Sequence, residues 1–150
     1  MRIALWLHVT GIVVWVGGMF FAHVALRPAA ASLPPPTRLP LLVATLRNFF
    51  RWAGLSIVVV LASGTWMASA SGGFNAAGIA IHAMTGIGLV MTLVYAYIVT
   101  APYRAMRAAV AASTWEAAGA AMGTIRRLVA LNLALGMLTI AIATLGKGMP

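Results

Sequence analysis

Few side chains in this 150-residue sequence could carry out chemistry: there are three histidines, one acidic residue and no cysteine. The lack of cysteine excludes disulfides, thiolate metal sites and thiol catalysis. The single acid, Glu116, excludes catalysis by paired carboxylates, and we interpret it as a surface partner for arginine. Any metal must therefore be held by imidazole, thioether or oxygen ligands.

Two of the histidines, His8 and His82, lie at corresponding positions, each a few residues inside an apolar stretch. At about 1.5 Å of rise per helical residue, both imidazoles are expected roughly 8–9 Å below the same membrane boundary. Polar side chains at such a depth are costly and are often functional. The spacing predicts that the two imidazoles face each other across a helical bundle.

Small residues surround both imidazoles. One stripe on the first apolar stretch, at spacings of three and four, consists of His8, Gly11, Trp15, Gly18 and Ala22, while Gly78 and Gly86 flank His82. Glycines beside a ligand leave room for a flat macrocycle, and axial histidine commonly holds haem iron. This pattern predicts haem b between His8 and His82. The alternatives are another metal, or ordinary small-residue packing in which each histidine bonds to a neighbouring helix.

Four further polar residues are candidates for supporting roles. His23, one turn before Arg27, is interpreted as an interfacial residue, or alternatively as a contact for a second cofactor, a metal or a quinone. Asn132, in the last apolar stretch, is interpreted as an interhelical hydrogen-bonding residue, with a hydrogen bond to a cofactor as the alternative. Arg2 and Lys147 are available to pair with haem propionates at the surface.

Methionines offer a second metal chemistry. Met67, Met84 and Met137 are expected near the depth of His8 and His82, and thioethers combined with imidazole are suitable ligands for Cu(I). However, Met84 lies two positions from His82 and points away from it on a helix, and lone methionines in apolar helices usually pack. Copper is therefore the alternative to haem, with Met84 and Met137 as its weakest candidate ligands.

The elements that position these side chains are apolar stretches, each with the roughly 20 residues that a helix needs to cross a bilayer. The chain is 63% hydrophobic and 7% charged, whereas soluble domains carry roughly a quarter charged residues. The sequence predicts an all-α integral membrane four-helix bundle in a single domain over residues 1–150. Its helices are expected at about 3–26, 52–70, 76–100 and 124–146.

Arginines are distributed unevenly between the two sides of the predicted membrane. The connection between the first two spans and the connection between the last two each carry four arginines, namely Arg27, Arg38, Arg47 and Arg51, and Arg104, Arg107, Arg126 and Arg127. The positive-inside rule therefore places both connections in the cytoplasm and both termini outside, which is the periplasm for a bacterial inner membrane. This cationic membrane edge accounts for the net charge of +9 without a nucleic-acid partner.

Prolines divide the arginine-rich connections. Leu33-Pro34-Pro35-Pro36 cannot continue a helix, and the following segment, about 41–51, is predicted to lie in the membrane interface and to lead into the second span. Pro102 predicts a kink or the start of a new helix, followed by helical extensions into the cytoplasm. Between the second and third spans, the uncharged run from Ser71 to Asn75 predicts an outer loop.

Several motifs resemble a known membrane family. The run LHVTGIVVWVGGMFF at residues 7–21 resembles the first-helix signature of CopD-type proteins, the copper resistance protein D domain, and also that of HemJ-type protoporphyrinogen oxidases. Gly64-Thr65-Trp66 is similar to the Gly-x-Trp at the end of their second helix. His82 falls where HemJ-type proteins have a third-helix histidine, and Arg127 and Asn132 resemble residues that open the fourth helix.

This resemblance implies a four-helix membrane domain, with haem b in the HemJ branch and periplasmic copper uptake or resistance in the CopD branch. It implies that His8 is the leading haem ligand and His82 a second ligand or pocket residue. The HemJ pattern has His-x-Lys in the third helix, whereas this sequence has His82-Ala83-Met84. Because the cation suited to the substrate's carboxylates is missing, the sequence is closer to the CopD side.

The leading hypothesis from the sequence is a small CopD-type membrane b-type cytochrome. It would pass electrons between a membrane donor such as quinol and an acceptor near the outer face, and any enzymatic activity would be that of a haem-dependent membrane oxidoreductase. The alternative is a copper-binding or transport protein for copper uptake or resistance, without haem, that works with a periplasmic copper partner. A weaker alternative is a structural membrane subunit. A homo-oligomer is compatible with each.

Overall fold

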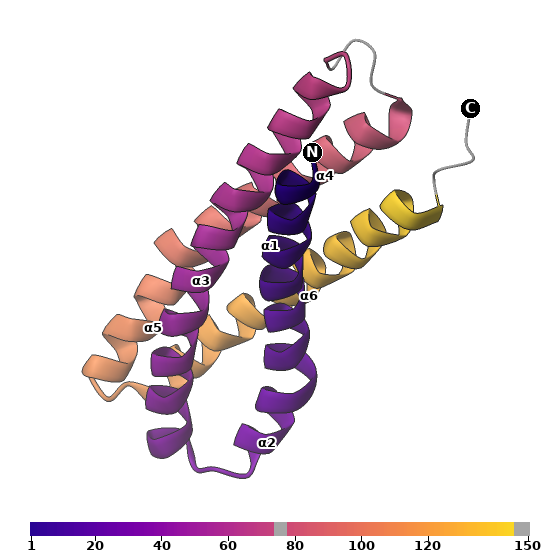
Figure 1. Ribbon diagram of the computed structural model, residues 1–150. Coiled ribbons are helices and arrows are strands. Elements are labelled where there is room, and N and C mark those ends of the chain that lie inside the picture. Colours follow the sequence, from indigo (N-terminus) through magenta and orange to yellow (C-terminus); the bar gives the residue numbers. More distant parts are fainter. Residues whose placement is uncertain (74–77, 146–150) are drawn as a thin grey trace.

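The computed structural model describes residues 1–73 and 78–145, and all regular structure in these ranges is helical (Figure 1). The first helix, α1 (Arg2–Phe21), continues through a π-helical turn, η1 (Ala22–Leu26), into α2 (Arg27–Ala31). The helices that follow are α3 (Pro35–Ala70), α4 (Ile79–Thr100), α5 (Pro102–Ala111) and α6 (Trp115–Leu145).

Four helical stretches in the described part of the chain are long and apolar enough to cross a membrane: Arg2–Ala31, Pro35–Ala70, Ile79–Ala111 and Trp115–Leu145. The predicted all-α fold with four spans is therefore confirmed, and the chain is a multi-pass membrane protein. The fourth helix begins earlier than expected from the apolar pattern, at Trp115, because its Ala-rich first turns are helical as well.

The two ends of the bundle differ in composition. At one end, called here the N-terminal end, α1 begins and α3 ends; at the other, the arginine-rich end, lie α2, α5 and the starts of α3 and α6 (Figure 1). The arginines of both connections are exposed there, apart from the half-buried Arg38. Lys147 and the residues from Phe74 to Ala77 lie outside the described ranges.

Proline chemistry sets the start of α3. Pro34 has extended backbone (ψ 151°), and Pro35 and Pro36 occupy the first helical positions, where a missing N–H is tolerated. From there the helix runs unbroken for 36 residues, about 54 Å. The expected interfacial segment 41–51 thus lies within the first half of the helix that contains the second span. Its buried residues recur every four positions: Leu42, Leu46 and Phe50.

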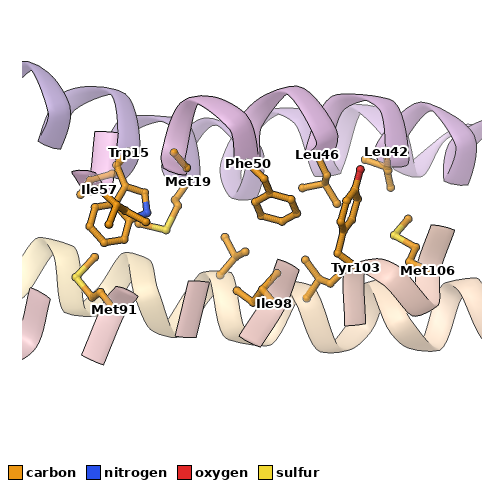
Figure 2. Close-up of a cluster of buried hydrophobic side chains, with 14 of the residues drawn as sticks. Trp15, Met19, Leu42, Leu46, Phe50, Ile57, Met91, Ile98, Tyr103 and Met106 are labelled. Carbon is orange, nitrogen blue, oxygen red and sulfur yellow. The ribbon is translucent and has the colours of Figure 1, made fainter. Parts of the chain in front are cut away.

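Helix packing follows a simple scheme: α1 packs mainly along α3, and α6 packs mainly against α4 and α5. The buried core extends along the bundle, from Trp15 and Met91 to Leu42 and Met106 at the arginine-rich end (Figure 2). Within it, the Tyr103 hydroxyl donates to the Val43 carbonyl over 3.1 Å. This bond ties α5 to α3.

A second tyrosine ties α4 to α3. The Tyr95 hydroxyl donates to the Phe50 carbonyl over 2.7 Å, and the rings of Phe50 and Tyr95 meet edge to face with centroids 6.1 Å apart. Gly54 permits this approach, because a Cβ there would lie only 2.7 Å from the Tyr95 hydroxyl.

Turn residues explain the remaining boundaries. α5 begins at Pro102, which confirms the predicted start of a new helix. Between α5 and α6, Ser113 adopts a left-handed conformation (φ 56°) that is unusual for a residue with a side chain.

The π-helical turn η1 accommodates a proline. The Arg27 amide bonds to the Ala22 carbonyl, five residues back, and this wider turn relieves the clash that Pro28 would cause in an α-helix.

Candidate metal-binding site

The imidazole of His8 is held by two acceptors on α3. Its Nδ1 lies 3.0 Å from the Val60 carbonyl oxygen and 3.1 Å from Ser63 Oγ. A carbonyl only accepts, so Nδ1 carries the hydrogen, and Ser63 Oγ is free to accept because it donates its own hydrogen to the Val59 carbonyl. A neutral His8 in this tautomer has its lone pair on Nε2, for which the described residues provide no hydrogen-bond partner.

Two glycines allow this arrangement. A Cβ on Gly64 would lie 3.1 Å from Cε1 and 3.5 Å from Nδ1 of His8, so the imidazole rests directly on the backbone of α3. A Cβ on Gly11 would lie 2.7 Å from Cγ2 of Val60 and 3.2 Å from the Ser56 carbonyl oxygen. Close approach of α1 and α3 therefore fixes both the position and the tautomer of the half-buried ring.

The remaining stripe residues of α1 also face packed structure. Trp15 is buried, with 4% of its surface exposed, and a Cβ on Gly18 would collide with the Phe49 ring at 2.6 Å. Side chains of α3 thus fill the space beside Gly11 and Gly18. The free volume that these glycines were expected to offer to a macrocycle is occupied by Val60 and Phe49.

His82 lies in different surroundings. It is exposed on α4, and its Nδ1 is 3.3 Å from the Gly78 carbonyl oxygen of its own helix. Among the described residues, no side chain or neighbouring helix lies within 4 Å of a Cβ built on Gly78 or Gly86. His8 bonds to α3, and a pair of imidazoles facing each other across the bundle stays a prediction.

Asn132 forms the interhelical hydrogen bond expected of it. Its side chain is 1% exposed, and Nδ2 donates to the Met91 carbonyl of α4 over 3.0 Å. The other end of the amide, Oδ1, is buried without a hydrogen-bond partner. A hydrogen bond from Asn132 to a cofactor stays a prediction.

The other predicted residues are dispersed. His23 is half-buried in the π-helical turn near the arginine-rich end, and Arg2 is exposed at the start of α1. Met84 is half-buried and Met137 is 55% exposed.

Within residues 1–73 and 78–145, no three histidine or acidic side chains are grouped so that they could hold a metal. A metal near His8 would therefore need thioether or backbone oxygen ligands beside one imidazole.

A shallow, mostly apolar groove between α1 and α3 reaches this region from the N-terminal end. Met1, Leu7 and Trp66 contribute to its walls, and so does Ser63, the hydrogen-bond partner of His8. Ser63 was not a candidate from the sequence. The sequence does place a hydroxyl inside an apolar span, directly before Gly64. That pattern is equally typical of a serine that bonds only to its own helix.

Comparison with known proteins gives one match. The family model described as Copper resistance protein D matches residues 43–145, from the first half of α3 to the end of α6. The matched segment contains Ser63, Gly64, His82 and Asn132, while His8 precedes it. Searches of curated proteins and of solved structures found no match. Since the matched segment covers more than half of the chain, the protein belongs to the copper resistance protein D family.

Proposed function

We propose that this membrane protein binds copper for uptake or resistance, and that His8 is the anchoring ligand at the N-terminal end of the bundle. The observation that carries the proposal is the orientation of the imidazole, with Nδ1 held by the Val60 carbonyl and Ser63 Oγ. Histidines that ligate metals commonly donate their other ring N–H to a carbonyl in this way, which leaves Nε2 for the metal. Family membership supports copper as the metal.

The donor atoms fit Cu(I) better than harder metals. The chain has no cysteine and one acidic residue, Glu116, which is exposed near the start of α6 at the arginine-rich end. Neutral imidazole and thioether groups are then the available ligands of useful strength, and such soft ligands select Cu(I). The half-buried Met67, near the end of α3, and Met84, near the start of α4, are thioethers on the N-terminal end of the bundle that could complete such a site.

Packing beside His8 favours copper over haem b. A single ion requires little volume, whereas a macrocycle against α1 would displace Val60 and Phe49 from Gly11 and Gly18. The chain's own residues would act by presenting Nε2 in a low-dielectric site near one membrane surface. With the arginine-rich end in the cytoplasm of a bacterium, that surface faces the periplasm, and copper reaches His8 from outside.

The test is Cu(I) binding by the purified protein in detergent micelles, titrated against a chromophoric Cu(I) chelator. Wild type is expected to bind copper stoichiometrically, and His8→Ala to bind at least about tenfold more weakly. The matched control is His23→Ala, which removes a half-buried imidazole near the other end of α1 and should bind like wild type.

An absorption spectrum of the same preparations distinguishes the cytochrome hypothesis. Copper binding that depends on His8, in a protein without haem absorption, supports the proposal. A Soret band that shifts on reduction and disappears in His8→Ala would overturn it in favour of haem b. Equal copper affinity in wild type and His8→Ala would remove His8 from the site.

A further inference from the structure

All four spans contribute buried side chains near the middle of the bundle. A Cβ on Gly136 of α6 would lie 3.0 Å from Cγ2 of Val16 on α1 and 3.3 Å from Cε of Met91 on α4. One turn earlier on α6, Asn132 bonds to the Met91 carbonyl. Figure 2 shows Met91 gathered with Trp15, Met19 and Ile57 at one end of the core.

The donor groups at this level are soft and uncharged. The thioethers of Met19 and Met91 are 2% and 3% exposed, and the Trp15 indole is 4% exposed. Trp15 and Met19 are one turn apart on the same buried face of α1, and Met91 of α4 belongs to the same buried cluster (Figure 2). Methionine has three rotatable bonds, so the two sulfur atoms can adjust to a ligand without movement of the backbone.

Asn132 supplies an observation that apolar packing does not explain. Its Oδ1 is fully buried and accepts no hydrogen bond from residues 1–73 or 78–145. An unsatisfied buried acceptor costs about 1–3 kcal/mol, and such an atom in a folded protein calls for a reason. The bond from Nδ2 to the Met91 carbonyl accounts for one half of the amide and leaves the oxygen unexplained. The free oxygen therefore points to an electropositive ligand near Asn132.

We propose that Met19, Met91 and Asn132 form an intramembrane site for Cu(I), on which the ion rests after leaving His8. This proposal rests on the proposed function. Two thioethers supply the soft ligands that select Cu(I), Oδ1 supplies a neutral oxygen, and the face of Trp15 attracts a cation. Met19 lies eleven positions after His8 on the same helix, which is about 16 Å of helix axis.

Weak binding is the expected property of this site. No carboxylate or thiolate is present to trap the ion, and conduction through a membrane requires sites that release as well as bind. The site would therefore be the second, weaker stop for the ion at the centre of the bundle, after the tighter ligand, His8, at the N-terminal end.

The experiment is methyl NMR of the full-length protein in nanodiscs, with ¹³C-labelled methionine methyl groups and Ag(I) as a redox-inert substitute for Cu(I). The nine methionines give separate probes, assigned by Met→Leu substitutions, which nearly conserve volume. The Met19 and Met91 methyl signals are expected to shift on addition of Ag(I). Met106, 0% exposed at the arginine-rich end, is the matched control and should not shift.

The stoichiometry of bound metal provides the second readout. The variant Met19→Leu/Met91→Leu should lose one bound Ag(I) while retaining the ion that depends on His8, and Met106→Leu should lose none. If Ag(I) binds at His8 but the Met19 and Met91 signals do not move in the wild-type protein, this inference is overturned and the proposed function stands. If the wild type binds neither Ag(I) nor Cu(I), both are overturned.

Discussion

Substitution of Gly64 by alanine tests whether the position of the His8 ring sets copper affinity. The new Cβ would lie 3.1 Å from Cε1 and 3.5 Å from Nδ1, whereas nonbonded carbon atoms prefer about 3.5–4.0 Å. The imidazole must therefore move by a few tenths of an ångström, which misaligns the 3.0 Å bond from Nδ1 to the Val60 carbonyl. Loss of such an orienting partner typically weakens metal binding about 10–100-fold. We expect the lower value, about tenfold, because Ser63 Oγ can still accept from the moved ring.

The stability of this variant should change little. Alanine is favoured over glycine in a helix interior by about 0.8–1.0 kcal/mol, and this gain offsets much of the strain from the contact with His8. Thermal unfolding in detergent should therefore occur near the wild-type temperature. A loss of copper affinity would then report the position of the ring and not the unfolding of the bundle.

The matched control is Gly86→Ala on α4, where a Cβ meets no atom within 4 Å. The assay is the competition titration of Cu(I) against a chromophoric chelator. Gly86→Ala should bind copper like wild type. The reasoning is refuted if Gly64→Ala also binds like wild type, or if Gly86→Ala loses as much affinity as Gly64→Ala.

Three further outcomes are expected. Tyr95→Phe removes the bond to the Phe50 carbonyl and should lower the free energy of unfolding by about 0.5–1.5 kcal/mol in detergent-mixture titrations. Ser113→Gly should raise the thermal unfolding temperature, because a left-handed conformation costs an L-residue about 1–2 kcal/mol and glycine little. A reporter active only in the cytoplasm should work when fused after Ala112, and one active only in the periplasm when fused after Gly73, as the positive-inside rule requires.

Controls for these outcomes are available in the chain. Tyr97→Phe alters an exposed ring on α4 and should leave the unfolding free energy unchanged, so equal effects of the two tyrosine substitutions would contradict the role of the Tyr95 bond. Ser113→Ala retains the side-chain penalty and should give no gain in thermal stability. Activity of the same reporter at both fusion sites would reverse or invalidate the topology.

Much of the fold could be predicted because membrane spans depend on length and apolar composition. Pro102 and the prolines at 34–36 marked real helix boundaries, since the geometry of proline is local. Segment 41–51 was predicted to lead into the second span, and α3 does run through both; its place in the membrane interface stays a prediction. The burial of Leu42 and Leu46 against the rest of the bundle depends on the neighbouring helices and could not be predicted from the sequence.

The candidate site was predictable in part. Spacing indicated His8, but the acceptor that orients it is a backbone carbonyl, which has no signal in the sequence. The predicted depths of His8 and His82 give only their level along the membrane normal. The direction in which each side chain points depends on the neighbouring helices. In the sequence, Met19 and Met91 look like methionines that only pack. The unsatisfied Asn132 oxygen, which singled them out as candidate ligands, is known only from the structure.

The uneven distribution of the core has a consequence for motion. None of residues 1–10, 79–90 or 137–145 is buried, and α4 is the least buried of the four spans, whereas Leu46, Phe50 and Met106 are enclosed at the opposite end. Local opening requires little free energy where few apolar contacts must be broken. Thermal fluctuations should therefore move α4 and the end of α6 away from the paired α1 and α3 at the end where His8 lies, while the aromatic cluster around Phe50 acts as a hinge. An ion could then pass inward from His8 without any unfolding of the protein.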